Sequence, residues 1–132
     1  MNESKNAGNF KDLIAWQKAM LVAELVYKLT SKFPAEEKFG LVSQMRRTAV
    51  SVPSNLAQSQ ARHTTGEFIQ FISHAEDSVA ELETQLLLSI QLDLAAKETT
   101  DPMLSLRAEV RRMLNAPRRS LVTRHLSLVT LP

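Results

Sequence analysis

Few residues of this chain combine a reactive type with a useful spacing. Cysteine is absent, which removes disulfides, thiolate metal ligands and cysteine nucleophiles. The histidines (His63, His74 and His125) are far apart, and neither an HExxH pattern nor a carboxylate–histidine spacing links them. Glu67 precedes His74 by two helical turns, unlike the Glu-x-x-His ligand pair of di-iron bundles. The sequence therefore predicts no metal site and no cofactor.

Nucleophile and phosphate-binding motifs are also missing. Ser78 is predicted to lie in the middle of a helix and has no GxSxG elbow around it. Neither GxxxxGK nor GxGxxG occurs. We expect a protein without enzymatic activity, in which Ser78 permits two helices to approach closely.

Arginine is the remaining residue type that could bind a ligand. Residues 63–101 contain one lysine and eight acids, whereas residues 102–132 contain six arginines and one acid, Glu109. This asymmetry suits either contact with nucleic acid or complementarity between helices. The candidates for contact with nucleic acid are Arg47, Arg111, Arg112, Arg118, Arg119 and Arg124.

The alternatives to nucleic-acid contact stay open. The C-terminal arginines are equally compatible with a solvated tail, or with one that neutralises the acidic third helix of a neighbouring copy. The basic region has no aromatic stacking platform, which argues against a module that reads RNA sequence. Arg46 is predicted to lie along the core and to pair with Glu76 or Glu83.

The first helical segment is predicted over residues 11–32, with Asn9 as its N-cap. Its apolar residues form three neighbouring rows, more than one adjacent helix can cover, which indicates a central position or an oligomer interface. Trp16 and Tyr27 lie in one of these rows, and we expect them to pack in the core.

Three further helices follow. The second is expected to begin near Glu36 or Glu37, and the third to follow a capping box at Thr64 and Glu67. The fourth is expected to open at Thr100-Asp101-Pro102 and to end or bend at Pro117. The inner faces of these helices are predicted from apolar stripes. The stripe of the second helix is Leu41, Met45, Ala49, Val52 and Leu56, and that of the third is Phe68, Ile72, Ala75, Val79, Leu82, Leu86 and Ile90. The stripe of the fourth helix is Met103, Leu106, Val110 and Met113.

These elements predict an all-α fold, a bundle of four helices packed side by side. We expect three parts: a disordered N-terminus (1–9), the four-helix bundle (10–116) and a basic C-terminal tail (117–132). The N-terminal residues are polar and lack the apolar core of a signal peptide, and no apolar run reaches the ~20 residues that span a bilayer. We expect a cytoplasmic protein that does not enter membranes.

Several motifs resemble one family. The sequence reads Phe10-x-Asp12-Leu13-x-x-Trp16-x-x-Ala19, then Phe33-Pro34-x-x-Glu37-x-x-Gly40-Leu41-x-x-Gln44-x-Arg46-Arg47. Ala49-x-Ser51-x-Pro53-x-Asn55, Glu67-Phe68 and Ser78-x-x-Glu81 follow. Together these residues resemble the four-helix-bundle proteins encoded in intervening sequences of bacterial 23S rRNA genes. One departure is Gln58-Ser59, where the family usually has Glu-Gly, so an easy left-handed helix stop is missing.

The resemblance implies an up-down-up-down bundle that assembles as a ring, a homopentamer, without enzymatic activity. A related branch of accessory proteins of diversity-generating retroelements implies RNA, DNA or a reverse-transcriptase-like protein as partners. The leading hypothesis is thus a homo-oligomeric scaffold that binds nucleic acid or a nucleic-acid enzyme. The alternative is a purely structural ring that binds only protein.

Overall fold

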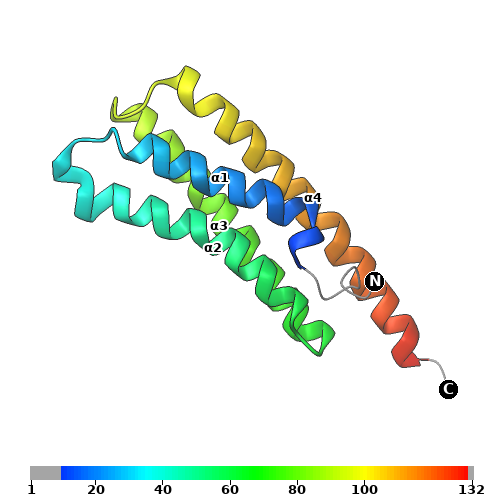
Figure 1. The fold of residues 1–132 in the computed structure, drawn as a ribbon. Coiled ribbons are helices and arrows are strands. Elements are labelled where there is room, and N and C mark those ends of the chain that lie inside the picture. Colours follow the sequence, from blue (N-terminus) through cyan, green and yellow to red (C-terminus); the bar gives the residue numbers. More distant parts are fainter. Residues whose placement is uncertain (1–9, 131–132) are drawn as a thin grey trace.

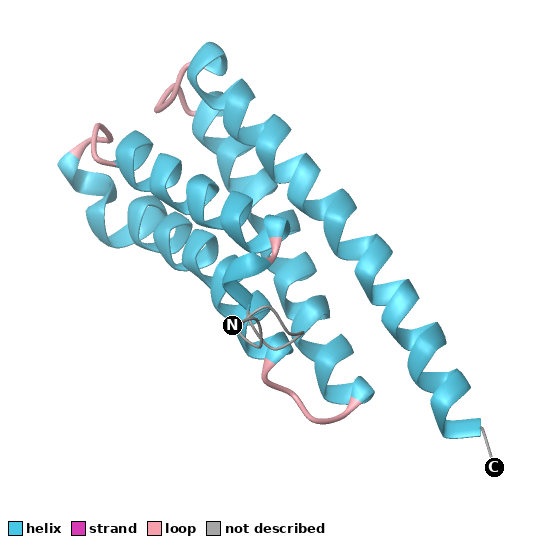
Figure 2. Ribbon diagram, turned by 45° about the vertical axis from the view of Figure 1, so that its right-hand side comes forward, coloured by secondary structure: helices cyan, strands magenta, loops and turns pink. Residues whose placement is uncertain are grey.

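The described part of the chain is helical throughout. The computed structural model describes the backbone of residues 10–130, and the side chains of residues 10–115 except that of Asp12. Its long helices are α1 (Ile14–Thr30), α2 (Ser43–Gln60), α3 (Thr65–Gln91) and α4 (Lys97–Thr130). A short turn of 3-10 helix, η2 (Phe10–Asp12), precedes α1, and two more short elements, η3 (Ala35–Glu37) and η4 (Lys38–Val42), lead into α2. No strand occurs within residues 10–130 (Figure 2).

The helices form the predicted up-down-up-down bundle. Each helix packs against the next one along the chain, and α4 packs back against α1 (Figure 1). The connections are short, so successive helices run in opposite directions. Within the described residues, no helix combines the length and the apolar character needed to cross a bilayer.

The core confirms most of the predicted apolar stripes. One cluster near the α1–α2 connection includes Val26, Met45 and Leu86, and a second near the α2–α3 connection includes Leu56, Ile72 and Leu114. On α3, all the predicted stripe residues from Ile72 to Leu86 are buried. The stripe repeats every three or four residues, and this spacing keeps its members on one helix face.

The start of α3 confirms one half of the predicted capping box. The backbone N–H of Glu67 donates to Oγ1 of Thr64 at 3.1 Å. By contrast, α1 begins at Ile14, later than predicted, with Leu13 before it and no side-chain cap. Asn9, the predicted cap, lies outside the described residues. The end of α2 agrees with the loss of glycine at position 59, because Ala61, the residue that follows the helix, has φ −95° and is not left-handed.

The start of α4 differs from the prediction. It begins at Lys97, so Thr100 lies inside the helix, where its hydroxyl donates to the carbonyl of Ala96 or Lys97. Pro102 is the sixth residue of α4, beyond the unpaired N–H groups of the first turn, so it leaves the carbonyl of Glu98 without its helical N–H donor. The helix also continues past Pro117 to Thr130, so Pro117 does not end it.

Candidate functional site

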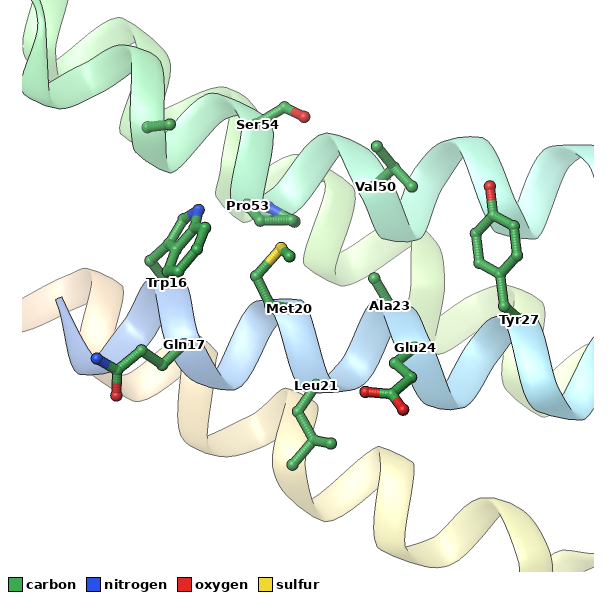
Figure 3. Close-up of a pocket in the computed structure, with 11 residues that line it drawn as sticks. Trp16, Gln17, Met20, Leu21, Ala23, Glu24, Tyr27, Val50, Pro53 and Ser54 are labelled. Carbon is green, nitrogen blue, oxygen red and sulfur yellow. The ribbon is translucent and has the colours of Figure 1, made fainter. Parts of the chain in front are cut away.

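An apolar groove runs along the outer side of α1 and α2. It has a volume of about 660 Å³. The residues of α1 that line it are Trp16, Gln17, Met20, Leu21, Ala23, Glu24 and Tyr27. The residues of α2 are Val50, Pro53, Ser54 and Ala57. In Figure 3, Trp16, Met20 and Tyr27 extend from α1 towards α2, whereas Leu21 points away.

The groove is hollow because small residues alternate with large ones. Ala23 and Ala57 are too short to fill the space between the two helices, while Met20 and Tyr27 form its sides. The side chains of Met20, Leu21, Tyr27 and Val50 are 46%, 45%, 44% and 41% exposed. Large apolar side chains gathered around a hollow are typical of surfaces that bind another molecule.

The groove corrects one prediction and supports another. Tyr27 is not in the core, since nearly half of its surface is exposed, and Trp16 is only half-buried, with its ring edge-on to Phe10 at 5.3 Å. The prediction that α1 has more apolar surface than its neighbours cover agrees with this exposure. Tyr27 could not be placed from its spacing alone, because Val26 and Leu29 take the inward positions beside it.

Arg46 contacts Tyr27, one of the residues that line the groove. Its Nε donates to Oγ1 of Thr30 at 2.8 Å and its Nη2 to the carbonyl of Tyr27 at 3.3 Å. The guanidinium carbon also lies 4.5 Å from the centre of the Tyr27 ring, which is a cation–π geometry. Arg46 therefore joins α2 to α1, and the predicted pairing with an acid of α3 is wrong.

Glu83, one of the two acids expected to pair with Arg46, has another partner. Oε2 of Glu83 lies 3.5 Å from Nη2 of Arg107, which is 7% exposed on α4. The sequence analysis did not single out Arg107. Its position between Met103 and Val110 on the inner face of α4 was the available signal, because residues spaced by three or four share a helix face.

Arg47 lies in a separate polar groove between α2 and α3. This groove has a volume of about 420 Å³ and is lined by Gln44, Arg47, Thr48, Ser51, Ser78 and Glu81. A hydrogen bond of 2.5 Å joins the hydroxyl groups of Ser51 and Ser78, in agreement with the prediction that Ser78 permits close helix approach. Arg47 is exposed, as predicted.

The structure does not gather the candidate arginines into one site. Arg111 and Arg112 are exposed next to each other on α4, whereas Arg47 is on α2, and the helices that pack on α4 are α1 and α3. The backbone of Arg118, Arg119 and Arg124 belongs to α4, but their side chains lie outside the described residues. Of the candidate arginines whose side chains are described, Arg111 and Arg112 are thus neighbours and Arg47 lies apart from them.

The histidines are equally separate. His63 is exposed between α2 and α3, and His74 is exposed on α3, with its ring 5.9 Å from that of Phe71. The side chain of His125 lies outside the described residues. Among the residues whose side chains are described, no group of three or more His, Asp or Glu residues could hold a metal ion.

Comparisons with known proteins agree with this fold. A crystal structure of a protein with unknown function, from the S23 ribosomal protein family of Bacteroides thetaiotaomicron, matches with a TM-score of 0.72 and 18% identity over 80% of this chain and 98% of that one. No curated protein matches. The sequence profile of the 23S rRNA-intervening sequence proteins matches residues 11–116. The chain, a four-helix bundle with an apolar groove on α1 and α2, belongs to the 23S rRNA-intervening sequence protein family.

Proposed function

We propose that this protein is a non-enzymatic scaffold that self-associates through the apolar groove. The observation that carries the proposal is the groove itself, a space of about 660 Å³ with Met20, Tyr27 and Val50 exposed around it. In a monomer these side chains stay in contact with water, whereas an interface buries them at a gain of roughly 25 cal/mol per Å². A homopentameric ring in the cytoplasm is the form of assembly that the family resemblance favours.

The test is the mass of the protein in solution, measured by analytical ultracentrifugation. We expect the wild type to sediment as an oligomer and Met20→Glu as a monomer, because a buried carboxylate without a partner opposes association. Ala80→Glu, an exposed alanine of α3 replaced in the same way, is the control and should remain oligomeric. A wild type that is monomeric at tens of micromolar, or a Met20→Glu variant that still assembles, would overturn the proposal.

Binding of a nucleic acid is a second candidate function. It is supported by Arg111 and Arg112, which are exposed side by side on α4, while the nearby acid Glu109 is paired with Nζ of Lys18 at 2.9 Å. Exposed guanidinium groups on two consecutive residues can each contact a phosphate of a nucleic acid. The alternative is a scaffold with protein partners only, in which case binding of nucleic acid should be absent even at low salt.

A further inference from the structure

Phe39 is the most exposed large apolar residue among those described. Its side chain is 89% exposed, about twice the exposure of any residue at the sides of the apolar groove. It lies in η4, the short element between α1 and α2, where the backbone of Gly40 departs from helical geometry with φ −107° and ψ −108°. The chain turns at this point, so that Val42 is buried while Phe39 faces solvent.

Phe39 and the groove cannot be partners within one chain. A phenyl ring that is 89% exposed is not seated in any cavity of its own molecule. The ring projects from the connection between α1 and α2, whereas the groove follows the bodies of these two helices. The chain therefore carries an apolar projection and an apolar hollow at two different places.

We propose that Phe39 of one copy occupies the apolar groove of the next copy. This inference rests on the proposed function, and it specifies which surface of the second copy enters the groove. An aromatic ring removes a large apolar area from water when it is buried, and such rings are frequent anchors of protein interfaces. A space of about 660 Å³ has room for the ring and for parts of the adjoining turn.

One pair of charges next to the two surfaces is complementary, although Glu36 and Glu37 also precede Phe39. Lys38 adjoins Phe39, with Nζ 5.6 Å from the ring centre, and Glu24 lines the groove. Glu24 now pairs with Lys28 one turn along α1 at 3.1 Å, and both side chains are well exposed. Such a surface pair contributes little, so Glu24 can exchange Lys28 for Lys38 of the incoming copy at small cost.

This contact is compatible with two kinds of assembly. Because projection and hollow are different surfaces, the contact can repeat heterologously from copy to copy. Heterologous contacts produce a ring where the rotation closes and an open chain where it does not. A two-fold dimer is the other possible arrangement, in which each copy places its Phe39 in the groove of the other.

Mixing two variants tests the inference. Phe39→Ala removes the projection and leaves the groove, while Met20→Glu blocks the groove and leaves the projection. Each variant alone should be monomeric. An equimolar mixture should form dimers and nothing larger, because Phe39 of the Met20→Glu chain can enter the intact groove of the Phe39→Ala chain only once. Circular dichroism checks that both variants fold, and Val50→Glu replaces Met20→Glu if that variant does not.

The outcomes separate this inference from the proposed function. A Phe39→Ala variant that assembles like the wild type, while Met20→Glu is monomeric, overturns the inference and leaves groove-mediated assembly intact. A mixture of folded variants that stays monomeric also overturns the inference. A wild type that is monomeric overturns both.

Disulfide trapping provides a second measurement, since the chain has no native cysteine. A Lys38→Cys chain mixed with a Ser54→Cys chain should form a mixed disulfide under mild oxidation, because Ser54 lines the groove. Ser105→Cys, an equally conservative change at an exposed position of α4, is the matched control. Equal yields with Ser54→Cys and Ser105→Cys would count against the proposed contact.

Discussion

Arg107 is the residue whose environment is least expected for its type. Its guanidinium is buried, and within the described residues Nε and Nη1 have no hydrogen-bond partner. Arg107 lines a small cavity together with apolar side chains such as Val22, Val79 and Leu82. A buried cation gains from Glu83 only part of what it loses in hydration. The stability of the fold therefore depends on Glu83 more than expected for an ion pair with a separation of 3.5 Å, because Arg107 is buried.

Removing Glu83 should cost more stability than removing Arg107. We expect Glu83→Ala to lower the free energy of unfolding by about 1–3 kcal/mol, because the guanidinium is left buried without a counter-charge. Arg107→Met keeps the apolar contacts and should change it by less than about 1 kcal/mol. In the double variant the cost of Glu83→Ala should largely vanish.

Urea denaturation provides these values, with Asp77→Ala, an exposed acid of the same helix, as the control. If Arg107→Met lowers the free energy of unfolding more than Glu83→Ala does, the guanidinium of Arg107 makes a net contribution to stability, which would contradict this prediction.

Single residues were the part that the sequence predicted least well. The apolar stripes of α2 and α3 could be predicted because each continues over several turns and has one spacing. Arg46 and Tyr27 could not, because their partners depend on the rotation of α1 relative to α2, which no local pattern specifies. The apolar groove followed from the sequence only as an excess of apolar surface on α1. Its α2 side, with Val50 and Pro53, required the structure.

The elements themselves were predicted with more success, and the errors lie at their ends. The start of α3 was predicted correctly because Thr64 caps the helix by accepting a hydrogen bond from the N–H of Glu67. The start of α4 was misplaced because Thr100-Asp101-Pro102 has the composition of a helix start. The actual start follows a loop in which Asp93 takes a positive φ of 61°, a conformation that aspartate adopts more readily than most residues.

The cap of α3 should make a measurable contribution to stability. We expect Thr64→Ala to destabilise the bundle by about 0.5–2 kcal/mol, because the N–H of Glu67 loses its acceptor. Thr84→Ala is a matched control, since its hydroxyl donates to the carbonyl of Ala80 inside the same helix and caps nothing. A fall in the midpoint of thermal unfolding for Thr64→Ala, without one for Thr84→Ala, would confirm the cap. Equal effects would indicate that the loss is not specific to the helix start.

At the scale of the whole molecule, the bundle separates its surfaces by chemistry. The apolar groove lies on α1 and α2, the polar groove that contains Arg47 lies between α2 and α3, and Arg111 and Arg112 lie on α4. Because α4 packs on α1 and α3, the proposed contacts between copies through α1 and α2 would leave the outer side of α4 uncovered. Assembly and binding of a polyanion are thus compatible on one molecule.

This separation leads to a prediction about nucleic-acid binding. Replacing Arg111 and Arg112 together with glutamine should weaken binding to a short RNA duplex and lower the slope of log K against log salt by about two, since two phosphate contacts are lost. The mass of the assembly should stay unchanged, because neither arginine lines the apolar groove.

The control is the double variant Lys28→Gln, Lys97→Gln, which removes the same charge from two residues that each pair with an acid one turn away. Equal losses of affinity in the two double variants would mean that only net charge matters, and that Arg111 and Arg112 form no phosphate site. If the wild type does not bind the RNA duplex even at low salt, α4 has only a structural role in the scaffold.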